Sequence, residues 1–116
     1  MPGGSFSGAI AETFGSIERA LVRIEEQDGG DAGLHHLRAD LLSLLELVER
    51  NSGIEAAVDD LYASASRFVA ARDQLAGDGD RSDARRSRLL REARQRLSDR
   101  LAAAVPNEHA KRLGLS

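Results

Sequence analysis

The fold class is decided by the stretch FSGAIAETFGSIERALVRI, residues 6–24, because its large apolar side chains recur every three or four positions. On a helix that spacing places them along one stripe. The stripe residues are Phe6, Ile10, Phe14, Ile17, Leu21 and Ile24. They predict an amphipathic helix over about 6–27, which ends at the glycine pair Gly29 and Gly30.

The same periodicity occurs in three further segments, over about 31–50, 53–76 and 82–105. Their stripe residues are Leu34, Leu37, Leu41, Leu44 and Val48; Ile54, Val58, Leu61, Ala65 and Phe68; and Leu90, Ala93, Leu97, Leu101 and Ala104. The segment 77–83 is expected to be a loop, and Pro106 is expected to end the last helix. No segment alternates with period two, so no strand is predicted.

Two helix starts have residues typical of N-caps. Asp31 is expected to cap the second helix, and Ser52 with Glu55 has the spacing of a capping box for the third. Because the connections are short, the four helices favour antiparallel neighbours within one domain, residues 1–116. The sequence therefore predicts an all-α, up-down-up-down four-helix bundle; the alternative is an intertwined dimer of helical hairpins.

Composition excludes several kinds of site. The chain has no cysteine, which excludes disulfides, thiolate zinc sites and cysteine nucleophiles. No apolar run reaches the roughly eighteen residues of a membrane span. The first ten residues lack the basic and apolar regions of a secretory signal, so a cytoplasmic location is expected.

Charge is divided unevenly along the chain. Residues 1–80 carry six arginines against fifteen acidic residues, whereas residues 81–116 carry ten basic residues against four acidic ones. Six of the arginines fall between Arg85 and Arg96. The favoured interpretation is a solvated helix face opposite the acids of the other helices. The alternative is a nucleic-acid surface, although no aromatic residue interleaves with these arginines to stack on bases.

One stretch offers a specific chemistry: LHHLRADLL, residues 34–42. If Leu37 points into the core, then His35 and Ala39 lie together on the solvent side, with Arg38 one turn from His35 and Leu42 on the same outer face. His36 falls on a flank with Asp40 four positions on, a spacing that suits a hydrogen bond or half of a metal site. A third ligand is not evident, so no metal and no cofactor is expected.

Residues 35–39, with the sequence HHLRA, resemble the H-x-L-K-G core of histidine phosphotransfer domains, which are four-helix bundles of about this length. The resemblance implies that His35 accepts a phosphoryl group from the aspartyl phosphate of a receiver domain in two-component signalling. It also implies that Arg38 holds the phosphate and that Ala39 takes the place of the family's small residue. From their place on the exposed face, Ala39 and Leu42 are expected to form the docking surface, since Ala39 leaves room for a partner and Leu42 offers it an apolar contact. The receiver would bring the metal ion and the leaving carboxylate.

The match has departures. Ala39 replaces the family's glycine, and Leu34 stands where a small residue is usual. The segment also resembles the H-E-L-R-x-P-L box of sensor histidine kinases, but Asp40 replaces the proline and no glycine-rich nucleotide-binding box follows. The alternative function is a non-catalytic helical interaction module, expected to be a homodimer. A further alternative is nucleic-acid binding through the arginine-rich helix.

Overall fold

The structure is a computed structural model that describes residues 6–26, 30–74 and 79–114. Its helices are α1 (Phe6–Glu25), α2 (Gly30–Leu45), α3 (Ser52–Gln74), α4 (Gly79–Ala102) and the short α5 (Glu108–Arg112). The all-α prediction is confirmed. Among the described residues, the one β-type pairing is an isolated bridge between Val48 and Pro106. No helix in these ranges is both long and apolar enough to cross a membrane.

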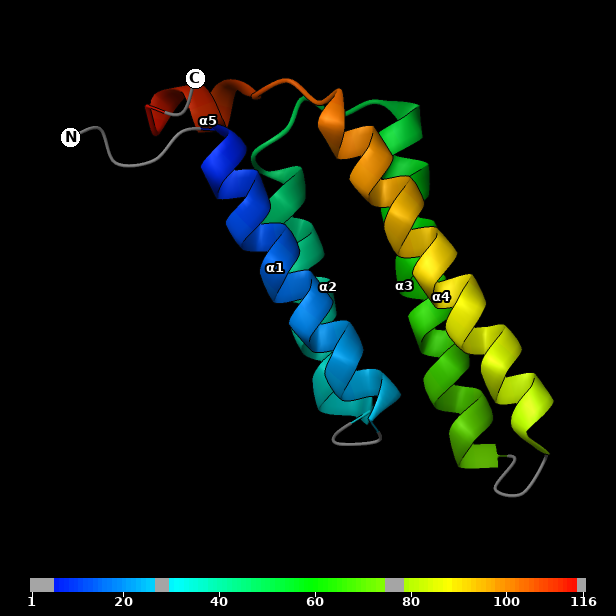
Figure 1. The fold of residues 1–116 in the computed structure, drawn as a ribbon. Helices are drawn as coiled ribbons and strands as arrows, with labels where there is room; N and C mark the ends of the chain where they lie inside the picture. The colour runs from blue at the N-terminus through cyan, green and yellow to red at the C-terminus, as the bar shows by residue number, and fades with distance from the viewer. Residues whose placement is uncertain (1–5, 27–29, 75–78, 115–116) are drawn as a thin grey trace.

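The long helices form two hairpins that lie side by side (Figure 1). α1 packs along α2, and α3 packs along α4, while contacts of α3 with α1 and α2 join the hairpins. The end of α1 and the start of α4 lie at one end of an elongated molecule of 52 × 25 × 17 Å, and α5 lies at the other. One apolar cluster runs through all four long helices.

The predicted stripes supply this core. Leu37, Leu41 and Leu44 of α2 are buried, as are Leu61 of α3 and Leu97 of α4. The stripe of α1 is buried over only half of its length. Its C-terminal residues Ile17, Leu21 and Ile24 are buried, whereas its first three are partly exposed: Phe6, Ile10 and Phe14.

The second helix is shorter than predicted, because Leu45 is its last residue and residues 46–51 take another course. The N–H groups of Glu46 and Leu47 bond to the carbonyls three residues earlier, which tightens the last turn. The chain then extends and pairs with the segment before α5. The Glu49 N–H donates to the Val105 carbonyl at 2.8 Å, and the Asn107 N–H donates to the Leu47 carbonyl at 3.0 Å. Val48 is therefore buried as predicted, but in an extended segment.

Two predicted caps are wrong. The Oδ1 of Asn51, not Ser52, caps α3, since it accepts a hydrogen bond from the Ile54 N–H at 2.9 Å. Asp31 is not the residue before α2, because the helix begins at Gly30 and Asp31 lies within its first turn. The last long helix also starts before its predicted position, at Gly79, so residues 79–83 of the expected loop are helical, while residues 77 and 78 lie outside the described residues.

The hairpin of α1 and α2 depends on a glycine. A Cβ added to Gly33 would lie 2.7 Å from Cγ1 of Ile24. Ile24 is fully buried, and Cγ1 is bonded directly to the Cβ at which its side chain branches. Neither the added Cβ nor Cγ1 of Ile24 can move aside easily, since both belong to helices that pack against each other. The absent side chain at Gly33 therefore sets how closely α2 approaches α1.

We expect Gly33→Ala to lower the free energy of unfolding by about 1 kcal/mol, because overpacking costs about 1–3 kcal/mol and outweighs a helix-propensity gain of about 1 kcal/mol. Gly15→Ala in α1 is the matched control. Its added Cβ would meet nothing closer than a nitrogen of Arg19 at 3.6 Å. The gain in helix propensity should therefore dominate, and we expect Gly15→Ala to be more stable than the wild type. Urea denaturation of both variants checks this; a Gly33→Ala protein as stable as Gly15→Ala would contradict the close approach.

Candidate functional site

The outer face of α2 carries the four residues singled out by the sequence: His35, Arg38, Ala39 and Leu42. All four are exposed, whereas Leu37 between them is fully buried. The orientation follows from the core stripe of α2, because a helix that buries Leu37, Leu41 and Leu44 must turn the positions between them outward. We call these four residues the α2 outer face.

His35 and Arg38 are available for a ligand or partner. Within the described part of the chain, neither side chain has a hydrogen-bond or ion-pair partner. One helical turn separates them, a spacing at which side chains on a helix surface can contact the same group. Leu42 is 50% exposed and extends this surface with an apolar side chain. An imidazole, a guanidinium and an apolar contact therefore share one accessible strip.

The second histidine has a different environment. Nε2 of His36 lies 3.2 Å from Oδ2 of Asp40, which confirms the predicted pairing, and 3.2 Å from Oγ of Ser16 on α1. The Ser16 hydroxyl itself donates to Asp40 Oδ2 at 2.7 Å. The three side chains join α1 to α2 beside the core, since the Asp40 side chain is only 19% exposed.

This Ser16–His36–Asp40 cluster does not have the arrangement of a hydrolase triad. In a triad the serine and the carboxylate contact different ring nitrogens, so that the histidine relays a proton between them. Here both contact Nε2, and the serine donates directly to the carboxylate. The cluster is a link between two helices. No group of three or more potential metal-ligating side chains is present within residues 6–26, 30–74 and 79–114.

Sequence reasoning missed Ser16, and one signal could have found it. Ser16 and Asp40 each stand twelve positions from residue 28, which falls in the sequence between the last residue of α1, Glu25, and the first residue of α2, Gly30. Residues equally distant from a short turn lie level with each other in a helical hairpin. Asp60 and Arg96 show the same relation, each eighteen positions from Asp78.

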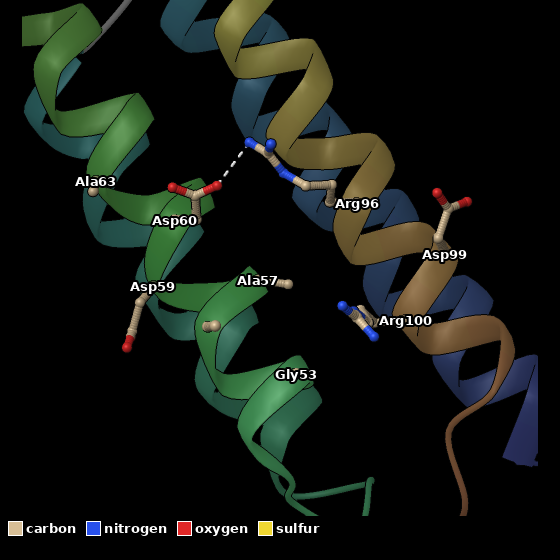
Figure 2. Close-up of a pocket in the computed structure, with 9 residues that line it drawn as sticks. Gly53, Ala57, Asp59, Asp60, Ala63, Arg96, Asp99 and Arg100 are labelled. Atoms are coloured by element: carbon tan, nitrogen blue, oxygen red, sulfur yellow. Dashed lines mark hydrogen bonds and ion pairs between the residues drawn. The ribbon is translucent and has the colours of Figure 1, made fainter.

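The arginines of α4 are partly neutralised, as the favoured interpretation predicts. Figure 2 shows the groove between α3 and α4, where Nη2 of Arg96 contacts Oδ2 of Asp60 at 2.7 Å. Arg94 lies 3.7 Å from Glu18 of α1. Both pairs are well exposed to solvent, so each contributes little to stability. They do remove two of the six charges from the surface that a nucleic acid would contact.

No protein-family model, no curated protein and no solved structure matches this chain.

Proposed function

We propose that this chain is a histidine phosphotransfer protein in which His35 accepts a phosphoryl group from a receiver domain and passes it to another. The observation that carries the proposal is the contrast between the two adjacent histidines. His35 is exposed beside Arg38 with no partner in the described residues, while His36 is engaged by Asp40 and Ser16. The resemblance of residues 35–39 to the phosphotransfer core supports the same assignment.

The chemistry requires one nucleophile and one group that stabilises charge. An unprotonated imidazole nitrogen of His35 attacks the phosphorus of the receiver's aspartyl phosphate. The phosphorus–oxygen bond breaks, and its electron pair leaves with the receiver's carboxylate. The resulting imidazolium then loses the proton on its other nitrogen to water. Arg38 neutralises the phosphate oxygens during transfer through charge-assisted hydrogen bonds.

The remaining residues of the face suit docking. Ala39 leaves room beside His35, and Leu42 offers an apolar contact one turn further along. We propose that the chain acts as an up-down-up-down four-helix bundle in the cytoplasm, where receiver domains are found. The packing of α1 on α2 and of α3 on α4 supports this topology.

The experiment is phosphoryl transfer from receiver domains of the source genome, each charged with radiolabelled acetyl phosphate. We expect one or more receivers to pass label to this protein. Arg38→Ala should slow transfer by about tenfold or more, because a hydrogen bond to a charged group contributes about 1.5–3 kcal/mol. Arg38→Lys should restore part of the rate, since it keeps the charge but loses the planar fork. Equal transfer rates for wild type and Arg38→Ala would show that Arg38 does not stabilise the phosphoryl group during transfer.

A second candidate function is a homodimeric helical interaction module. It is favoured by a groove between the start of α1 and the end of α4, in which no charged residue is found among the described lining residues. The lining residues are Phe6, Ser7, Ile10, Ala11, Phe14, Ser98, Leu101, Ala102 and Ala104. Depletion of charge is typical of interface cores. A dimer in analytical ultracentrifugation that Phe14→Glu dissociates, together with no labelling by any receiver, would favour this candidate.

A further inference from the structure

The seam between α3 and α4 contains a second concavity, distinct from the groove in Figure 2. It lies toward the end of α3 and the start of α4, and its volume is about 300 Å³. It is lined by Ser64, Arg67, Arg85, Arg86 and Leu89. We call it the basic pocket. It lies on other helices than the α2 outer face, so it is independent of the proposed phosphotransfer.

Three arginines line the basic pocket, and among the described lining residues there is no acidic one. Arg67 comes from α3, while Arg85 and the half-buried Arg86 come from α4. Within the described residues, Arg67 and Arg85 form no ion pair or hydrogen bond. The like charges of Arg67 and Arg85 repel each other across the pocket, and a bound anion would relieve that repulsion.

The other half of the same seam provides an internal comparison. There the α4 guanidinium of Arg96 meets the α3 carboxylate of Asp60 at 2.7 Å. In the basic pocket, α3 contributes an arginine and a serine instead of an acid. At this end of the seam, therefore, no α3 carboxylate among the described lining side chains faces the α4 arginines.

We propose that the basic pocket binds the phosphate end of a small molecule, either a phosphate monoester or a short polyphosphate. Guanidinium groups fit phosphate oxygens with paired hydrogen bonds, and the Ser64 hydroxyl is a further donor. Leu89, which is 44% exposed, offers an apolar contact to the rest of the ligand.

A compact ligand fits better than a nucleic-acid strand. The volume of the basic pocket lies at the lower limit for small-molecule sites, which is about 300 Å³. Among the described lining residues there is no aromatic side chain to stack on a base. Arg67 and Arg85, one from each helix, match a compact phosphate with several negative charges, whereas a strand would spread single charges along the helix.

The test uses inorganic phosphate, pyrophosphate and tripolyphosphate as probes, with sulfate for comparison, followed by calorimetry and by NMR of the arginine side chains. We expect tripolyphosphate to bind most tightly and to shift the signals of Arg67 and Arg85. Arg67→Gln and Arg85→Gln should each weaken binding about tenfold, because each removes a charge-assisted contact. Circular dichroism establishes that the variants remain folded.

Arg88→Gln and Arg91→Gln are the matched controls. Both remove one exposed charge from α4 but lie outside the pocket lining, so we expect binding within about twofold of wild type. Equal weakening by the controls, equal binding of sulfate and tripolyphosphate, or no binding would each overturn the proposal. A single-stranded oligonucleotide that binds more tightly than tripolyphosphate and competes with it would assign the pocket to nucleic acid instead.

Discussion

Replacement of His35 by alanine is expected to abolish phosphoryl transfer to this protein from any receiver domain that labels the wild type. Without the imidazole nitrogen, no nucleophile remains on the α2 outer face, since Arg38, Ala39 and Leu42 cannot accept a phosphoryl group. The fold should be unaffected, because an exposed side chain without partners contributes little to packing. Loss of label with an unchanged thermal transition is the expected pair of observations.

His36→Ala is the matched control, because it removes the adjacent imidazole. His36 faces Asp40 and Ser16, and the negative charge of Asp40 would repel an incoming phosphate. We therefore expect His36→Ala to retain transfer. If His36→Ala loses label and His35→Ala keeps it, the assignment of roles to the two histidines is wrong.

Leu61→Ala should cause the largest loss of stability among single substitutions considered for this chain. Leu61 is fully buried in the middle of α3, in the apolar cluster shared by all four long helices. Removing its side chain leaves a cavity and costs about 2–5 kcal/mol. That is a large part of the roughly 5–15 kcal/mol that stabilises a typical domain.

The control for Leu61→Ala is Leu42→Ala, the same substitution at a site that is 50% exposed. Its effect on the free energy of unfolding should be within about 0.5 kcal/mol, as is usual for surface substitutions. Urea denaturation of both variants measures the difference. Similar stabilities of the two variants would contradict the assignment of Leu61 to the core.

The helices and most of the core could be predicted because periodicity is a local property. A stripe such as Leu37, Leu41 and Leu44 identifies its buried face without knowledge of the partner helix. The incomplete burial of Phe6, Ile10 and Phe14 could not be predicted in this way. It depends on how far α4 covers the start of α1, which is a property of the tertiary arrangement.

The early end of α2 has a similar cause. Val48 continues the leucine stripe, so periodicity extends the helix through it. Backbone hydrogen bonds to Val105 and from Asn107, almost sixty residues away, fix the segment in an extended conformation instead. Only the structure brings these segments together.

The candidate sites show the same difference between features that depend on one helix and features that depend on two. The exposure of His35 and the pairing of His36 with Asp40 follow from positions on a single helix, and the sequence predicted both. Ser16 and Arg67 each come from a different helix than the residues they join, so no local pattern pointed to them. Sites within one helix follow from periodicity alone, whereas sites between helices also require the relative position of the two helices, as the equal distances of Ser16 and Asp40 from residue 28 illustrate.

The most direct measurement of the proposed function is the position of the phosphoryl group on the wild-type protein after transfer from a receiver. Cleavage after Arg23 and Arg38 gives one peptide, residues 24–38, that contains both His35 and His36. Fragmentation under neutral conditions must therefore separate the two adjacent residues. We expect an acid-labile, base-stable phosphoryl group on His35. A phosphoryl group on His36 would contradict the assignment of His35, and an acid-stable one on a serine or no label from any receiver would contradict the phosphotransfer function.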